Sequence, residues 1–252
     1  MQFGAHILRY EVVGSTQDAA RERALAGAPA GTVVAAEAMT AGRGRQGRAW
    51  HTPPGANVCL TAIGEPVPLP AAWQIALVGG VAACEAIREA LGEGGPTARV
   101  RYPNDVLLGG KKVCGVLVET VAAPGRSARE VVPMIGIGIN VKAPSEPLPP
   151  EIAAVATSLE GETGRPHDVR SVEAALLRRL SEEWRVWQAG GLPAVLARWK
   201  PLLDPDARRV FVVDGVPVAC RVVDLAPDGT LSIELSGVGL RRSVPAAAAL
   251  ME

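Results

Sequence analysis

The most informative stretch of this chain is Gly42-Arg43-Gly44-Arg45-Gln46-Gly47-Arg48-Ala49-Trp50. It holds three arginines, three glycines and a tryptophan within nine residues. Glycine lets a backbone adopt positive φ and approach a ligand closely, and each guanidinium offers donors that match a phosphate or a carboxylate. An isolated Arg-Gly run is more often a solvated turn, but this composition also suits a loop that folds over an anion.

The glycines of this loop also match the G-x-G-x-x-G fingerprint of dinucleotide-binding folds. That fingerprint requires a preceding strand, a helix that opens on the last glycine, and an acidic residue about 20 positions later. A strand is predicted at 32–38, but the following Trp50-His51-Thr52-Pro53-Pro54-Gly55 cannot open a helix. A Rossmann oxidoreductase is therefore a weak alternative.

Length and composition narrow the class of protein. The 252 residues suffice for one large domain and a small one. Lysine and arginine (26) balance aspartate and glutamate (26), so the overall charge of a dedicated nucleic-acid binder is missing. The four cysteines and three histidines are scattered, without the spacing of a disulfide framework or a zinc site. No signal peptide or membrane-spanning run is present, so we expect a cytoplasmic protein without membrane or DNA partners.

The remaining pattern predicts an α+β fold with a mixed sheet. Strands are predicted at 7–13, 32–38, 58–63 and 131–141, a hairpin joined by Gly109-Gly110 within 99–120, and helices at 17–25, 71–91, from Asp168 onward and at 192–199. After a linker at 201–206, short strands at 210–213, 216–225, 231–235 and 238–244, with turns at Asp214-Gly215 and Pro227-Asp228-Gly229, predict a small closed β-barrel. We expect a catalytic domain at 1–203 and a β domain at 204–252.

Three further stretches carry polar side chains beside glycines or turns. Ser15 or Thr16 can cap the first predicted helix, whose N-terminus also exposes free N–H groups to a ligand. Asn104 and Asp105 follow a proline and offer oxygen ligands for Mg²⁺. Lys112 begins an apolar strand, where a lysine is more often a solvated edge residue than a catalyst.

The strand at 131–141 lacks side chains at Gly136 and Gly138 and ends at Asn140. A ligand or another part of the chain can approach this backbone closely, and the amide of Asn140 can both donate and accept hydrogen bonds at the rim.

Taken together, these motifs resemble biotin protein ligases. The resemblance rests on Ser15-Thr16-Gln17-Asp18, the Arg-Gly loop with Trp50, Tyr102-Pro103-Asn104-Asp105 with Lys112 and Gly115, and Gly136-Ile137-Gly138-Ile139-Asn140. Each motif is weak alone, but all four occur in the family's order, and the match covers essentially the whole chain. The resemblance implies a sheet related to class II aminoacyl-tRNA synthetases, with a C-terminal SH3-like barrel.

The resemblance also implies a reaction and a set of site residues. Biotin and MgATP would give biotinyl-5′-AMP, from which a lysine of a biotin carboxyl carrier protein domain would take the biotinyl group. Lys112, Arg45 and Arg43 would be catalytic, and Asp105 would bind magnesium. The biotin site would comprise Ser15, Thr16, Gln17, Met39, Gly42, Arg43, Gly44, Arg45, Lys112, Gly115 and Leu117. The ATP site would comprise Arg45, Arg48, Trp50, Asn104, Lys112 and Asn140.

The sequence departs from the family in three places. Met39 stands where a glutamine is usual, Arg101-Tyr102 replaces the usual Lys-Trp, and the chain begins at the first strand of the catalytic domain, as in members without a DNA-binding domain. Two other functions stay open: a lipoate or octanoate ligase or transferase of the same fold, and a non-catalytic biotin-binding protein. The basic loop favours biotin, and retention of Lys112 and Asp105 favours catalysis. A homodimer is left open.

Overall fold

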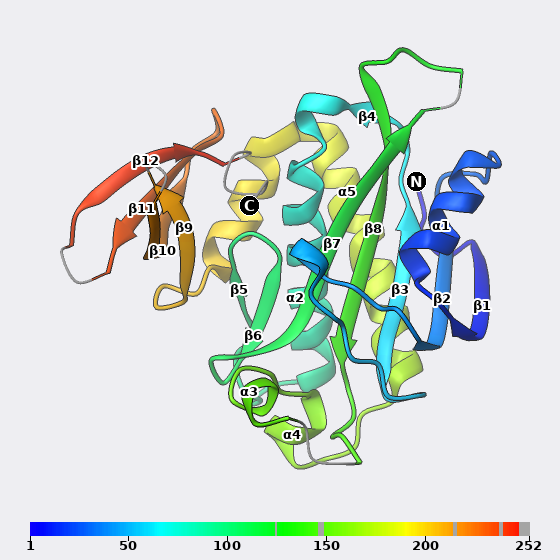
Figure 1. Ribbon diagram of the computed structural model, residues 1–252, viewed down its shortest axis with the longest axis horizontal. Coiled ribbons are helices and arrows are strands. Elements are labelled where there is room, and N and C mark those ends of the chain that lie inside the picture. Colours follow the sequence, from blue (N-terminus) through cyan, green and yellow to red (C-terminus); the bar gives the residue numbers. More distant parts are fainter. Residues whose placement is uncertain (124, 146–148, 214–215, 237–238, 247–252) are drawn as a thin grey trace.

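The computed structural model describes residues 1–123, 125–145, 149–213, 216–236 and 239–246. Its largest part is an eight-stranded sheet (Figure 1). The strands follow one another as β1 (His6–Val13), β2 (Thr32–Met39), β3 (Asn57–Ile63), β8 (Glu130–Asn140), β7 (Lys111–Ala122), β6 (Asp105–Leu108) and β5 (Arg99–Arg101), and β4 (Val67–Pro68) pairs with β8. Since β1 and β2 run parallel and the other pairs run antiparallel, the sheet is mixed, as predicted.

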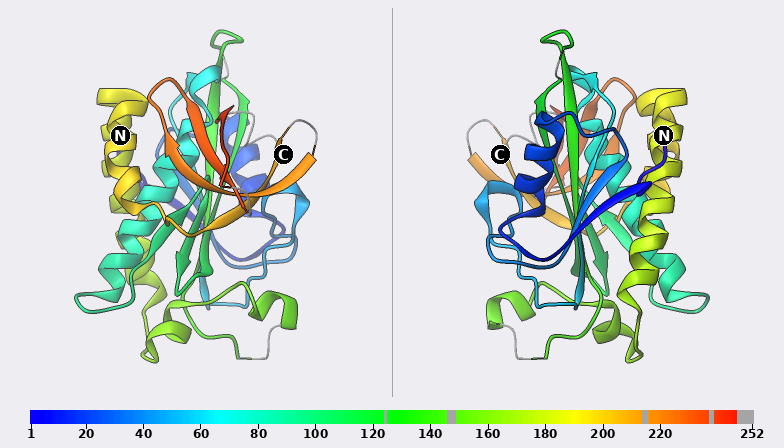
Figure 2. Two further views of the ribbon diagram at one scale, coloured as in Figure 1. Left: turned by 90° about the vertical axis from the view of Figure 1, so that its left-hand side faces the viewer. Right: turned by 90° about the vertical axis from the view of Figure 1, so that its right-hand side faces the viewer.

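Helices cover both faces of this sheet. Figure 2 shows α2 (Gln74–Leu91) and α5 (Val169–Trp199) on one side and α1 (Thr16–Leu25) on the other. Two hydrophobic clusters follow from this arrangement, a large one beneath α2 and α5 and a small one beneath α1. Helix α2 packs very close to β7, because a Cβ at Gly79 would lie 2.8 Å from Val116 Cγ1. Within the described residues, no helix has the length and apolar character that crossing a membrane requires.

The predicted helices form with small shifts. Ser15 caps α1, since its hydroxyl accepts a hydrogen bond from the Gln17 N–H. Helix α2 begins at Gln74 instead of 71, because a 3₁₀ turn, η2 (Leu69–Ala71), precedes it. The two helices predicted after Asp168 are two parts of α5, which breaks at Gly191, where φ is 59° and ψ is −153°. Two short helices, α3 (Pro150–Ala153) and α4 (Leu159–Thr163), were not predicted.

The C-terminal module is an antiparallel sheet in the order β12 (Arg241–Pro245), β11 (Thr230–Leu235), β10 (Val216–Leu225) and β9 (Arg208–Val213). It follows a short 3₁₀ turn, η3 (Lys200–Leu202). No pairing of the described residues joins β9 to β12, so closure into a barrel stays a prediction. The predicted turn at Asp214-Gly215, the strand start at Val238 and residues 247–252 lie outside the described residues.

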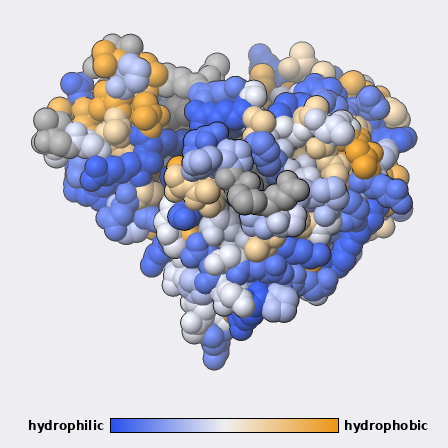
Figure 3. Space-filling view, turned by 60° about the horizontal axis from the view of Figure 1, so that its bottom comes forward, coloured by the Kyte–Doolittle hydropathy of each residue, from blue (hydrophilic) through white to orange (hydrophobic). Residues whose placement is uncertain are grey.

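The inner face of this module packs against the large domain. Phe211, Val222 and Ile233 belong to the same hydrophobic cluster as α2 and α5. Its outer face carries exposed valines at 210, 212 and 216, and Figure 3 shows apolar side chains gathered at the left, where Figure 1 places this sheet. Residues on both sides of the boundary predicted at 203/204 therefore contribute to one hydrophobic core, and the boundary itself stays a prediction.

Candidate active site

A cavity of about 940 Å³ lies on the α1 side of the main sheet. Its walls come from the start of α1, the loop at 43–50, the β6–β7 hairpin, the end of β8, the segment 152–161 and β9. Every predicted site residue except Gly42 lines this cavity. The carbonyl of Gly42 instead accepts a hydrogen bond from the Trp50 N–H at 2.9 Å, which closes the base of the loop.

One end of the cavity is built around the N-terminus of α1. The Thr16 hydroxyl accepts a hydrogen bond from Thr61 Oγ1 at 3.0 Å. The Thr16 N–H and hydroxyl both point to the sulfur of Met39, at 3.5 and 3.6 Å. Sulfur is a weak hydrogen-bond acceptor, so Met39 satisfies Thr16 but offers no amide to a ligand at the position where glutamine is usual.

Gln17 and Trp50 fill the space that two glycines of β8 leave open. A Cβ at Gly136 would lie 2.7 Å from Gln17 Nε2, and a Cβ at Gly138 would lie 2.6 Å from two carbons of the Trp50 indole. Gln17 Nε2 donates to the carbonyl of Leu117 at 2.8 Å. Gln17 Oε1 is buried and has no hydrogen-bond partner among the described residues, which fits a ligand that donates a hydrogen bond.

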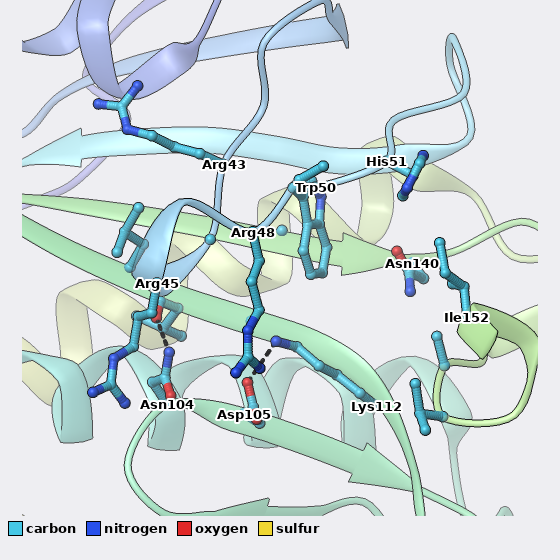
Figure 4. Close-up of a pocket in the computed structure, with 18 of the residues that line it drawn as sticks. Arg43, Arg45, Arg48, Trp50, His51, Asn104, Asp105, Lys112, Asn140 and Ile152 are labelled. Atoms are coloured by element: carbon cyan, nitrogen blue, oxygen red, sulfur yellow. Dashed lines mark hydrogen bonds and ion pairs between the residues drawn. The ribbon is translucent and has the colours of Figure 1, made fainter. Parts of the chain in front are cut away.

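The three loop arginines do not converge. The guanidinium of Arg43 is turned toward α1, where it contacts both oxygens of Asp18 at 2.8 Å and the carboxylate of Glu119 at 3.1 Å (Figure 4). It also donates to the Ser15 hydroxyl at 3.2 Å. Hydrogen bonding from Arg43 holds the pKa of Asp18 below its ordinary value. Arg43 therefore ties the loop to α1, and its catalytic role stays a prediction.

Arg45 and Arg48 extend from the loop toward the Asn104–Asp105 corner (Figure 4). Arg45 begins a short 3₁₀ turn, η1 (Arg45–Gly47), and Arg48 follows it, while a bridge between Arg43 and Ala49 closes the loop. Both residues line the cavity, and their contacts with phosphate stay predictions.

Asp105 is 2% exposed and pairs with cations on both carboxylate oxygens. Lys112 Nζ lies 2.6 Å from Oδ1, while Arg101 Nη2 and Arg209 Nη1 lie 2.7 and 3.2 Å from Oδ2. Burial alone would raise the pKa of Asp105, but Lys112, Arg209 and Arg101 together lower it to about 2. Asp105 is therefore an anion at neutral pH, and it fixes the ammonium of Lys112 in the cavity.

This arrangement does not fit a magnesium site at Asp105. Magnesium prefers several oxygen ligands in octahedral geometry, whereas three cationic groups already surround this carboxylate. The described part of the chain contains no group of three or more His, Cys, Asp or Glu side chains that could hold a metal ion. The side chains thus give no support to the predicted metal ligand.

Lys112 is not a solvated edge residue, because its backbone is paired on the side away from β6. Its N–H donates to the carbonyl of Val155 at 2.8 Å, and its carbonyl accepts from the Thr157 N–H at 2.9 Å. The same segment holds Asn140, whose amide donates to the carbonyl of Thr157 at 3.0 Å. The ammonium lies 5.4 Å from the centre of the Trp50 ring, a cation–π distance.

Two parts of the cavity wall were not predicted from the sequence. The segment 152–161 carries no charged motif, so only its backbone pairing to Lys112 reveals it. Arg209 comes from the C-terminal module and reaches Asn104 and Asp105, a contact between residues more than one hundred positions apart. Asn104 itself donates one N–H to the carbonyl of Val116 at 2.6 Å, and its oxygen accepts from Arg209, so its contact with the nucleotide stays a prediction.

The sequence of this chain is similar to those of known ligases. Residues 10–140 match the model of the biotin/lipoate A/B protein ligase family. The biotin–[acetyl-CoA-carboxylase] ligase of Mycobacterium tuberculosis is 31% identical over 229 residues, which cover 89% of this chain and 81% of that protein. The bifunctional ligase/repressor BirA of Bacillus subtilis is 36% identical over 198 residues, which cover 78% of this chain but only 59% of BirA.

Among solved structures, the fold is similar to that of the biotin protein ligase from Aquifex aeolicus in complex with biotin and ATP. The TM-score is 0.73, at 24% sequence identity, over 96% of this chain and 99% of that one. This likeness confirms the predicted fold, including the position of the C-terminal β module in the chain. With the matched family model and the extent of the sequence similarity, it follows that the chain belongs to the biotin/lipoate A/B protein ligase family.

Proposed function

We propose that this protein activates biotin with ATP to form biotinyl-5′-AMP and then transfers the biotinyl group to a lysine of a biotin carrier domain. One observation carries the proposal: a single cavity joins an end where the amide oxygen of Gln17 has no partner among the described residues to an end lined by Arg45, Arg48 and Lys112. The first end suits the cyclic urea and apolar chain of biotin, because Gln17 Oε1 can accept a hydrogen bond from a ring N–H. The second end suits phosphates.

In the first step, a carboxylate oxygen of biotin attacks the α-phosphorus of ATP. A new oxygen–phosphorus bond forms, and the bond to the pyrophosphate breaks. Carboxylate and triphosphate repel one another, so fixed cations are needed to bring them into line. Lys112 provides such a charge, because Asp105 holds its ammonium at 2.6 Å and the segment 155–157 holds its backbone. Arg45 and Arg48 add two guanidinium groups from the loop that faces Lys112 across the cavity.

In the second step, the amine of the carrier lysine attacks the carbonyl carbon of the mixed anhydride. The carbonyl–oxygen bond to AMP breaks, and the amine nitrogen loses a proton as the amide forms. Lys112, Arg45 and Arg48 stabilise the departing phosphate, and Trp50 covers the anhydride from solvent. We further propose that the reaction takes place in the cytoplasm and that magnesium enters with ATP, since the side chains at Asp105 do not form a site for it.

Mass spectrometry of a carrier domain tests this function. Incubation with the protein, biotin and MgATP should add one biotinyl group to one lysine of the carrier, and omission of ATP should abolish the product. Lipoate and octanoate, supplied in place of biotin, test the alternative within the family. Modification by either acid but not by biotin would contradict the proposal, as would an unmodified carrier in all reactions.

A further inference from the structure

Arg209 extends from β9 of the C-terminal module into the active site. Its Nη1 donates to the backbone carbonyl of Tyr102 at 3.0 Å, to Asn104 Oδ1 at 3.4 Å and to Asp105 Oδ2 at 3.2 Å. One nitrogen of Arg209 thus contacts three polar groups of the β5–β6 corner. Among the described residues, the side-chain hydrogen bonds of Arg209 all come from this nitrogen, so Nε and Nη2 keep their capacity to donate.

The C-terminal module is fixed at the same corner by aromatic packing. The Tyr102 ring stacks on Phe211, with ring centres 6.3 Å apart, and meets Trp199 edge-on at 6.1 Å. The Tyr102 hydroxyl donates to the carbonyl of Ala246 at 2.9 Å. Arg209 and Phe211 lie two residues apart on β9 and therefore on the same face of the strand, so the packing that buries Phe211 also directs Arg209 toward Asp105.

The charges at this corner are unbalanced. Asp105 supplies one negative charge, whereas Lys112, Arg101 and Arg209 supply three positive ones within 3.2 Å of it. Burial lowers the pKa of the Arg209 guanidinium, and the nearby Arg45, Arg101 and Arg48 lower it further, while Asp105 opposes them. Such an excess of fixed positive charge is stabilised when a polyanion binds.

We propose that Arg209 is a positioning residue of the active site, which holds Asp105, and through it the ammonium of Lys112, in place for the attack on ATP. The inference rests on the proposed function and extends it, because it makes the C-terminal module part of the catalytic apparatus. Removal of Arg209 leaves Asp105 free to turn toward Arg101, and the Lys112 ammonium then loses its fixed position. A displacement of about 1 Å is enough to cost about 100-fold in rate.

The test compares Arg209→Met with Arg208→Met, which changes the exposed neighbouring arginine that does not line the cavity. In biotin-dependent ATP–pyrophosphate exchange, Arg209→Met should lower kcat by about 10- to 100-fold and leave the KM for biotin unchanged. Arg208→Met should behave as wild type. Arg209→Lys should recover part of the loss, because an ammonium keeps the charge but not the fork geometry.

A double-mutant cycle with Asp105→Asn separates positioning from a merely structural role. If Arg209 acts through Asp105, Arg209→Met should have little further effect on kcat in the Asp105→Asn background, whereas independent structural effects should add. Additive losses, or an Arg209→Met variant that equals Arg208→Met, would overturn the inference while leaving the proposed function intact.

The affinity for an anion can be measured even if the protein shows no exchange activity, so it gives a second test of the inference. Calorimetric titration of inorganic tripolyphosphate should show several-fold weaker affinity for Arg209→Met than for Arg208→Met and wild type. Should wild type lack exchange activity, the proposed function fails on its own. The titration would still support Arg209 at the anion site if the affinities differ, and it would overturn the inference if they are equal.

Discussion

The two glycines of β8 allow biotin and ATP binding to be perturbed separately. In Gly138→Ala, the new methyl group would lie 2.6 Å from carbons of the Trp50 indole. Ordinary contacts between carbon atoms are about 3.5–4.0 Å, so the indole must move by about 1 Å. In Gly136→Ala, the methyl group would lie 2.7 Å from Gln17 Nε2 and displace an amide that contacts two backbone carbonyls.

The size of each effect follows from the interaction that is lost. Stacking of a base on an aromatic ring contributes about 1–3 kcal/mol, so Gly138→Ala should raise the KM for ATP by about tenfold or more, at about 1.4 kcal/mol per tenfold. Loss of two hydrogen bonds at about 1 kcal/mol each should make Gly136→Ala raise the KM for biotin by a similar factor. Since Trp50 belongs to a loop, Gly138→Ala should unfold only slightly more easily than wild type.

Steady-state exchange kinetics, with ATP and biotin varied in turn, distinguish the two effects. Gly80→Ala provides the control, because the nearest atom to its added methyl group is Val100 Cγ1, at 3.9 Å. The assignment of the two ends of the cavity would be refuted if both β8 variants raised the same KM, or if neither raised any.

Three further changes test single interactions. Lys112→Ala should lower the rate of biotin-dependent exchange by about 100-fold or more with little change in melting temperature, and a wild-type rate would show that the ammonium does no chemistry. Arg43→Ala should speed tryptic cleavage at Arg45 and Arg48, because it releases the loop from α1; unchanged cleavage would argue against this tether. Asp105→Asn should cost about 2.5 kcal/mol of unfolding free energy at pH 7, from a pKa of about 2 against an ordinary 3.8 at about 1.4 kcal/mol per unit. Because this pKa is lowered, the contribution is present above about pH 4 and disappears as the pH falls through 2, so a cost that persisted at pH 2 in denaturant unfolding would contradict its electrostatic origin.

Much of the fold could be predicted because its signals are local. The Ser15 cap, the Gly109-Gly110 turn and the apolar run of β8 each depend on neighbouring residues. The glycines at 136 and 138 predicted a close approach to the β8 backbone, but periodicity could not tell whether a ligand or another segment approached. The structure answers this with the side chains of Gln17 and Trp50.

The remaining parts of the site depend on contacts between distant residues. The sequence places Arg43 beside Arg45 and Arg48, yet its charge is neutralised by Asp18 and Glu119, which lie on other elements. The pairing of Arg209 with Asp105 depends on how β9 packs against Tyr102. No pattern within either segment records such contacts, so the tether of the loop and the contribution of the C-terminal module could be found only in the folded chain.

The proposed function requires the cavity to activate biotin with ATP. ATP–pyrophosphate exchange, measured with biotin, lipoate and octanoate as alternative acids, tests it most directly, because exchange requires the acyl-adenylate but no carrier protein. Exchange should depend on biotin and should be lost in Lys112→Ala. Exchange supported by lipoate or octanoate but not by biotin, or no exchange with any of the three acids, would contradict it.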